Sequence, residues 1–478
     1  MKRSELDPTE RWLVGIVAVH LCFLPWAFGT VHLWSQLVSL ALSTTGLVVA
    51  LRPRPPGEDP ASAASRTRPG ARLLRFPLFW TGLALLAYIA VQGLNPAWRY
   101  ASNASMWWLE PAAPVRWLPS GMAVPFSQAG PWRALIILGS LWLLAGSVWI
   151  GFLRRLSYRI LFSVLVVNAA LLALFGSIQK VTGATKIFGV YPPSNSSFIA
   201  SFIYRNHAGA YFNLLLALAT GLAWWHYQRA QRRFDKSSPA GLYAFAGLIV
   251  GVTVLFTYSR TATFLLVGFV GLVLGVFALR QFSQPAATRS RAMLLGLTLV
   301  FAAFLGAGLY ALHIEKVWHN MATMIHDPAA SARDRTQAHQ AAAEMLCDHW
   351  AFGWGAGCFR YGFPRYVMNY PEIYYVGPSQ RMFWEHAHND LLEFPIELGA
   401  FGMAPVLFAL GFLAWQLTRH RFWANPLSLI IGFGCVLTVA HGWVDFVFQC
   451  PAILLTWGFL LVAARRWSEF DAANRMQG

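Results

Sequence analysis

Residues 260–280 read RTATFLLVGFVGLVLGVFALR, an apolar run with an arginine at each end. An α-helix needs about 20 mostly apolar residues to cross the hydrocarbon core of a bilayer. A run of this length with no internal charge is too long and too uniform for the core helix of a small soluble domain. The stretch therefore predicts a membrane-spanning helix.

The rest of the chain repeats this pattern. Of its 478 residues, 56% are hydrophobic and only 12% are charged, and the mean hydropathy is +0.47, so its apolar surface needs lipid as a solvent. We expect an all-α polytopic membrane protein with about twelve helices. The predicted spans lie near residues 12–30, 33–51, 76–94, 132–152, 160–178, 207–225, 240–257, 262–280, 292–313, 397–417, 424–444 and 451–464.

The basic residues predict how these helices are oriented. The net charge of +17 comes from Lys and Arg that lie between the apolar runs without a nucleic-acid-binding motif, so we expect no nucleic acid partner. Lys and Arg resist translocation, and they gather in alternate connecting segments. Both termini are therefore predicted to be cytoplasmic. The first apolar run has no small-residue cleavage site after it and is expected to be a retained anchor.

Four connecting segments are long. The Pro/Ala/Ser/Arg-rich segment 52–75 predicts a disordered cytoplasmic loop, whereas 95–130, 180–205 and 314–395 are predicted to lie outside. Segment 314–395 separates nine helices in 1–313 from three in 396–478, and we expect it to be a large, partly helical periplasmic loop. Cys347 and Cys358 in this loop could form a disulfide or remain two unpaired thiols.

The outer loop holds two groups of candidate residues. In SARDRTQAHQ, Ser331 and Asp334 have the spacing of a capping box, which would place Arg335 in the first turn of a helix with His339 on the same face. Backbone N–H groups and an arginine at a helix start can bind phosphate oxygens. The alternative is a surface helix whose arginines are merely solvated.

The second group follows Gly353, Gly355 and Gly357, which permit a sharp backbone turn, and lies in FWEHAHNDLLEFPIELGAFG. This segment places Glu385, His386, His388 and Asp390 at the start of the tenth span. A neutral imidazole there can accept a proton from a hydroxyl group. Alternatively, the histidines only bond the helix end, or they bind a metal, although no third ligand has a recognisable spacing.

Two further arginines lie on the outer side, where basic residues are disfavoured. Arg260 occupies a short turn between two predicted helices, and Arg205 precedes the sixth span in YRNHAG. A charge held at such a place usually has a partner, so both are candidates for binding a substrate. The alternative is that they reach lipid phosphates.

The chain resembles the O-antigen ligase and Wzy-type polymerase superfamily. The resemblance rests on SRTA at 259–262, on RDRTQAHQAAAEMLCDHWAFGWGAG at 333–357 and, most specifically, on HNDLLEFPIELGAFG at 388–402. It implies that Arg260 and Arg335 face a carrier diphosphate and that His388 is the essential histidine. Arg333 remains an alternative to Arg335, and Arg205 and His386 are further substrate-binding candidates. The chain has His339 where an aromatic residue is more usual, and Trp350 where proline is.

The resemblance also implies a GT-C-like fold and an activity. Such proteins are metal-independent glycosyltransferases in the bacterial inner membrane that need no cofactor and act on the periplasmic face. They transfer a glycan, with inversion, from undecaprenyl diphosphate to a hydroxyl acceptor. We expect an O-antigen ligase acting on lipid A core, with membrane lipids as further partners. The alternatives are a Wzy-type polymerase, a protein O-oligosaccharyltransferase and, from another class, a lipid-linked glycan flippase.

Overall fold

The structure is a computed structural model that describes residues 6–53, 68–193, 197–282, 302, 328–375 and 381–476. Its described residues are mostly helical and include one small β-sheet. The chain divides into two compact units. Unit 1 contains Met1–Leu161, Ala332–Phe422 and Gly442–Gly478, and unit 2 contains Phe162–Ser331 and Trp423–His441.

The prediction of an all-α polytopic membrane protein is confirmed. Eight of the described helices are long and apolar enough to cross a membrane. These helices are α2 (Leu33–Ala50), α4 (Pro77–Leu94), α5 (Pro131–Gly151), α6 (Arg155–Val181), α7 (Arg205–Arg233), α9 (Arg260–Phe282), α16 (Asp390–Arg419) and α17 (Pro426–Val444). The predicted span 292–313 lies outside the described residues, so the number twelve stays a prediction.

Three of the remaining helices also coincide with predicted spans. They are α1 (Pro8–Trp26), α8 (Ala240–Phe256) and α18 (Pro451–Met476). The expected disorder of segment 52–75 is wrong for its end, because Pro69 begins the short helix α3 (Pro69–Leu74); residues 54–67 lie outside the described residues. The remaining helical elements are η1 (Phe28–Thr30), α12 (Pro328–Asp348), α13 (Phe359–Gly362), α14 (Pro364–Val367), α15 (Pro371–Tyr374), η4 (Phe422–Ala424) and η5 (Val447–Gln449).

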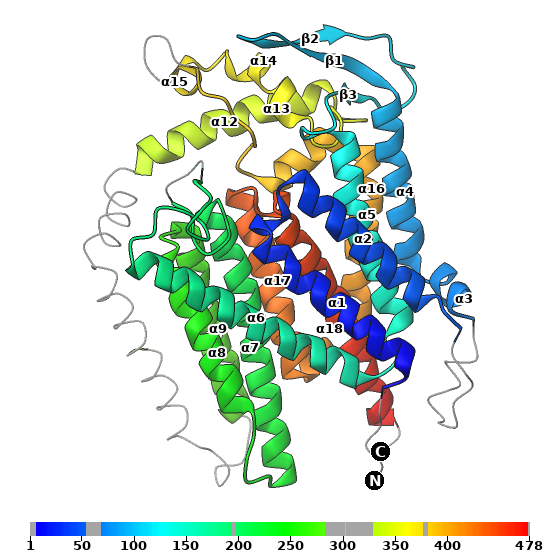
Figure 1. Cartoon of the computed structure of the whole chain (residues 1–478), viewed down its shortest axis with the longest axis vertical. Helices are drawn as coiled ribbons and strands as arrows, with labels where there is room; N and C mark the ends of the chain where they lie inside the picture. Colours follow the sequence, from blue (N-terminus) through cyan, green and yellow to red (C-terminus); the bar gives the residue numbers. More distant parts are fainter. Residues whose placement is uncertain are drawn as a thin grey trace. The chain divides into compact units, whose positions relative to one another are not determined.

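At one end of unit 1, segments 95–130, 332–375 and 381–389 fold into a small layer of their own (Figure 1). Strand β1 (Pro96–Ser102) pairs antiparallel with β2 (Trp107–Pro111) and parallel with β3 (Gly121–Ala123), an element that the sequence did not predict. The buried face of α12, formed by Ala338, Ala341, Ala342 and Met345, has helical spacing and belongs to the same core as β3 residue Met122. The layer therefore has its own apolar core.

Helix α16 is kinked at Gly399, and the kink anchors this layer to the bundle. Gly399 has φ +64° and ψ 179°, which opens the helix backbone for hydrogen bonds from outside. Trp354 N–H donates to the Ile396 carbonyl (2.8 Å), and Ala400 N–H donates to the Trp350 carbonyl (2.8 Å). Gln92 on α4 bonds the same region, donating to the Glu397 carbonyl at 3.1 Å. These bonds fix α16, and with it the segment that contains the candidate histidines.

Replacing Gly353 with alanine is expected to destabilise the protein strongly. Gly353 has φ +71°, and a Cβ atom there would lie 2.4 Å from the Glu397 carbonyl oxygen and 2.6 Å from the backbone nitrogen of Gly399. Left-handed backbone strain alone costs about 1 to 2 kcal/mol, and this clash with backbone atoms adds to it. Thermal unfolding of the purified protein measures the effect. Gly411→Ala is the control, because nothing lies within 4 Å of a Cβ there; equal unfolding temperatures for both variants would contradict the prediction.

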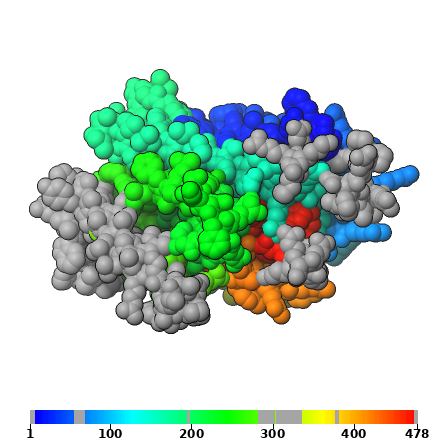
Figure 2. All heavy atoms as spheres, turned by 90° about the horizontal axis from the view of Figure 1, so that it is seen from below, coloured from blue at the N-terminus to red at the C-terminus, as the bar shows by residue number. Residues whose placement is uncertain are grey.

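At the opposite end of unit 1, the start of α1 meets the end of α18. The buried Glu10 carboxylate accepts hydrogen bonds from the N–H groups of Leu153 (3.0 Å) and Arg154, between α5 and α6. Arg466 on α18 donates to the adjacent Phe152 carbonyl (3.3 Å). In Figure 2, part of α18 is visible in red on the face seen from below. The start of α1 and the C-terminal part of α18 therefore lie on the same side of unit 1. The assignment of that side to the cytoplasm stays a prediction.

Candidate functional site

His388 forms a hydrogen-bonded dyad with a carboxylate that the sequence did not single out. Its Nδ1 lies 3.2 Å from Oδ1 of Asp445, just after α17. Asp445 is 1% exposed, whereas the His388 side chain is 29% exposed. A carboxylate only accepts hydrogen bonds, so Nδ1 carries a proton and Nε2 keeps a lone pair in the neutral ring. The dyad therefore presents an oriented base to solvent.

The backbone and two aromatic rings hold the His388 imidazole in place. His388 has φ +51°, a left-handed conformation that is uncommon for a residue other than glycine. Its ring makes edge contacts with Trp384 (5.8 Å between centroids) and Phe446 (4.9 Å). The following α16 begins at Asp390, whose N–H donates to the Asp445 carbonyl (3.2 Å). Such strain persists where surrounding contacts fix the conformation, and it is common at functional sites.

His386 is more buried than His388 and contacts the same Phe446 ring. It stacks on Phe446 at 4.4 Å, and its Nδ1 lies 2.7 Å from Oε1 of the buried Glu393. Arg360 Nη2 lies 3.5 Å from His386 Nε2. A guanidinium can only donate, so Nε2 accepts and Nδ1 donates to Glu393. His386 is thus held as the neutral Nδ1–H tautomer and links Arg360 to Phe446.

Arg335 lies close to the dyad. Its Nη1 donates to the carbonyl of Val444 (3.3 Å), the residue before Asp445. His339, one turn further along α12, is half-buried beside both candidates. Burial lowers the pKa of His339, and the nearby charge of Arg335 lowers it further. The structure therefore brings together Arg335, His339 and His388, three residues from the predicted groups.

The expected helix start near Arg335 is wrong. Helix α12 begins at Pro328, so Ser331 lies inside it and cannot cap it. Proline suits the first position of a helix because its φ is already helical and it has no N–H to leave unpaired. Arg335 therefore lies beyond the first turn, and its own side chain, not free backbone N–H groups, faces the site. The side chain of Arg333 lies outside the described residues.

Arg205 and Arg260 belong to unit 2, where they lie at the same end. Helices α7 and α9 begin side by side, because a Cβ at Gly209 would lie 2.5 Å from that of Ala262. Asn213 also donates to the Ala262 carbonyl (2.9 Å). Arg205 and Arg260 are the first residues of these two helices, and both side chains are partly exposed. Packing between small residues thus brings these two candidates to one end of unit 2.

Metal binding and a disulfide were the remaining alternatives. Across the described parts of the chain, no group of three or more His, Cys, Asp and Glu side chains could hold a metal ion. All five cysteines are free, with Cys347 exposed and Cys358 buried, so the two do not form a disulfide.

Asp445, Glu393 and Arg360 are the functional candidates that the sequence analysis missed. Asp445 carried a signal, because it is a carboxylate directly after the apolar run 424–444 in HGWVDFVFQ. A charge at the end of a span needs a partner, whether it is a carboxylate or an arginine. Glu393 also had a signal, since it lies seven residues after His386 and one turn into α16. Arg360 had none.

The fold and these side chains define a multi-pass membrane protein with a histidine–carboxylate site at one end of a helical bundle. Residues 244–407 match the protein-family model described as O-antigen ligase. The match confirms the resemblance to the O-antigen ligase and Wzy-type superfamily. It includes Arg260, Arg335 and both candidate histidines, whereas Asp445 lies outside it. No curated protein matches the chain.

Proposed function

We propose that this protein is an inverting, metal-independent glycosyltransferase of the bacterial inner membrane that acts on the periplasmic face. It transfers a glycan from undecaprenyl diphosphate to a hydroxyl acceptor. The observation that carries the proposal is the dyad of His388 and Asp445 within hydrogen-bonding geometry beside Arg335. The family match supports a lipid-linked glycan donor, and the apolar helices support a membrane-embedded carrier.

His388 is the general base in this proposal. A hydroxyl group is a poor nucleophile at neutral pH, and removal of its proton in the transition state raises the rate about 10² to 10⁴-fold. His388 Nε2 takes the acceptor proton while Asp445 holds the opposite nitrogen and stabilises the imidazolium that forms. The acceptor oxygen forms a bond to the anomeric carbon of the donor. The partial exposure of His388 lets a substrate reach Nε2.

Departure of the carrier completes the reaction. The bond between the anomeric carbon and the phosphate oxygen breaks, and its electron pair leaves with the diphosphate. Arg335 and Arg260 stabilise this growing charge, since guanidinium groups form strong charge-assisted bonds to phosphate oxygens. Attack opposite the leaving group inverts the anomeric carbon. The products are the glycosylated acceptor and undecaprenyl diphosphate.

The proposal also names the acceptor of the glycan. We favour lipid A core, the acceptor of an O-antigen ligase, since the matched model carries that description. The test incubates purified protein with one carrier-linked glycan and, separately, lipid A core, a second carrier-linked glycan or an acceptor protein. Product on lipid A core alone supports the ligase. Product only on the second glycan identifies a polymerase, and product only on protein identifies an O-oligosaccharyltransferase. No transfer in any reaction would contradict the proposed activity.

Arg335→Ala and Arg260→Ala are each expected to lower kcat/KM for the lipid-linked donor by roughly 10² to 10³-fold, the usual loss when one charge-stabilising donor is removed. Initial rates with the purified protein and a defined donor measure the effect. Lysine at either position should restore part of the rate, because it keeps the charge but not the bidentate geometry. Arg280→Ala, at the far end of α9, is the control. Donor kinetics unchanged from wild type in both alanine variants would remove the arginines from this role.

A further inference from the structure

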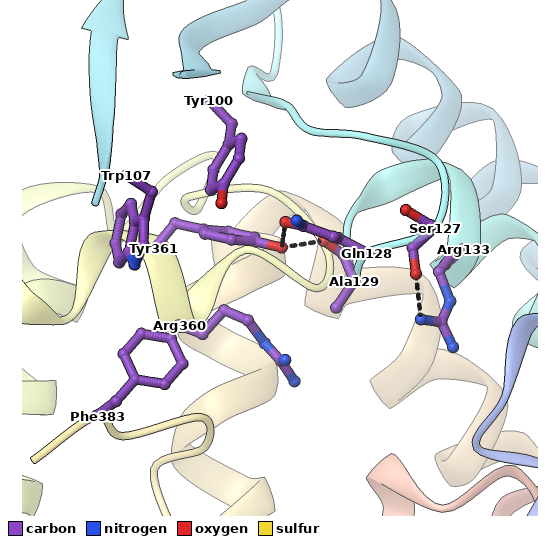
Figure 3. A pocket seen from close by; sticks show the side chains of 9 residues that line it. All are labelled: Tyr100, Trp107, Ser127, Gln128, Ala129, Arg133, Arg360, Tyr361 and Phe383. Carbon is purple, nitrogen blue, oxygen red and sulfur yellow. Dashed lines mark hydrogen bonds between the residues drawn. The ribbon is translucent and has the colours of Figure 1, made fainter. Parts of the chain in front are cut away.

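Unit 1 contains a pocket of about 350 Å³, and one wall of it is aromatic. The lining residues of that wall are Tyr100, Trp107, Tyr361 and Phe383 (Figure 3). Trp107 lies 5.9 Å from Tyr100 and 6.1 Å from Phe383 between ring centroids. Tyr361 is fixed by hydrogen bonds from its hydroxyl to Gln128 (3.1 Å) and to the Ala129 carbonyl (3.0 Å). The wall is thus rigid and offers flat apolar faces.

The opposite side of the pocket is cationic. Arg360 extends from the aromatic wall toward the side where Arg133 lies, and none of the nine lining residues is acidic (Figure 3). Arg133 donates to the Gln36 side-chain oxygen (3.0 Å) and to the carbonyls of Ser127 (3.2 Å) and Val31 (2.7 Å), all of them neutral. Within the described residues no carboxylate pairs with it, so its charge is not neutralised.

The charge of Arg360 is only partly compensated. Its Nη1 lies 3.8 Å from a carboxylate oxygen of Glu385, whose side chain is 61% exposed. Solvent around the exposed Glu385 screens this attraction, so the pair does not cancel the local field. Two guanidinium groups therefore face a small, partly enclosed volume. A negatively charged group on a ligand would satisfy both of them.

Arg360 also connects the pocket to the dyad. It contacts His386, which stacks on Phe446, and Phe446 makes the edge contact with His388. These contacts link the pocket to the dyad by way of His386 and Phe446. Aromatic faces pack against the C–H faces of sugar rings, and an adjacent arginine pair selects a charged substituent.

We propose that this pocket is an acceptor subsite that binds an anionic saccharide, one that carries a phosphate or carboxylate group. The inference rests on the proposed glycan transfer, which it deepens by naming the acceptor class. The aromatic wall orients the sugar ring, and Arg133 and Arg360 bind its charge. The hydroxyl that reacts is then presented to His388 from a neighbouring sugar.

Calorimetric binding tests the subsite without turnover. The full-length protein in phosphatidylcholine nanodiscs is titrated with a glucose oligosaccharide that carries one phosphate, and with its unphosphorylated form. We expect the phosphorylated probe to bind at least about 10-fold more tightly, as expected for charge-assisted bonds. Arg360→Gln and Arg133→Gln should abolish this preference for the phosphorylated probe. Phe383→Ala should lower the affinity for both probes by several-fold. Arg133→Lys should retain part of the preference for the phosphorylated probe. This result would show that the fold tolerates a substitution at position 133.

Matched controls come from exposed residues of segment 95–130 that do not line the pocket. Arg116→Gln and Trp117→Ala should bind both probes like the wild type. Equal affinity of the wild type for the two probes would overturn the proposal. So would a loss of the preference for the phosphorylated probe in the control variants as large as in Arg360→Gln and Arg133→Gln. So would loss of probe binding in phosphatidylglycerol nanodiscs, which would assign the pocket to a lipid headgroup.

Kinetics separate this proposal from the proposed function. In the transfer assay, Arg360→Gln should raise the KM for a charged acceptor about 10-fold and leave the KM for the donor unchanged. A rise in the donor KM alone would contradict an acceptor subsite. Selective probe binding by a protein that transfers no glycan to any acceptor would keep the saccharide site and reject the transferase.

Discussion

His388→Ala is expected to abolish glycan transfer, with a loss of about 10² to 10⁴-fold in kcat. The imidazole is the group placed to take the acceptor proton, and alanine leaves Asp445 without a base to orient. Protein abundance in the membrane should stay at the wild-type level, because the side chain is partly exposed and packs only at its edge. Product formation by the purified protein is the measurement.

The left-handed backbone at His388 requires a second variant. Alanine is strained at φ +51°, so a loss of activity could come from a local rearrangement. Asparagine adopts this conformation more readily and cannot act as the base, so His388→Asn should lose activity as fully as alanine. His420→Ala, at the other end of α16, is the control. Wild-type turnover by either His388 variant would remove this residue from catalysis.

Asp445→Asn is expected to lower kcat by roughly 10²-fold or more with little change in the KM for the donor. The amide has nearly the shape of the carboxylate but can donate to Nδ1, which favours the tautomer with its proton on Nε2. The charge that stabilises the imidazolium is also lost. Separate determination of kcat and KM tests this, with kcat expressed per amount of folded protein so that misfolding does not count as lost turnover.

An exposed carboxylate provides the comparison for Asp445. Glu344 on α12 accepts a hydrogen bond from the Tyr370 hydroxyl (2.7 Å) at the surface of the same unit. Glu344→Gln should keep the kcat of the wild type. A kcat for Asp445→Asn within about twofold of the wild type would show that the carboxylate does not orient the base.

The helices could be predicted because the bilayer imposes one length and one composition on each of them. The β1–β2–β3 sheet could not, because its short strands lie within a loop and depend on the core beneath α12. The helix start before Arg335 was misplaced by a Ser and Asp spacing that also occurs inside helices, whereas Pro328 gave the better signal.

The site was predictable only in part. His388 stands out locally, because it precedes the start of a spanning helix. Its partner Asp445 lies 57 residues away, and only the packing of α16 beside the end of α17 brings the two together. The pocket has the same origin, since Arg133 and Arg360 are distant in sequence and neither carries a motif. Arg260 was predicted to face the same diphosphate, and this stays a prediction.

The central claim is that His388 and Asp445 act as one unit, and a double-mutant cycle of kcat tests it most directly. The measurement compares His388→Asn, Asp445→Asn and the double variant with the wild type, using one purified preparation of carrier-linked glycan and acceptor. Without its base the carboxylate has nothing to orient, so the double variant should be no slower than His388→Asn alone. Losses that multiply in the double variant would mean that the two side chains act independently.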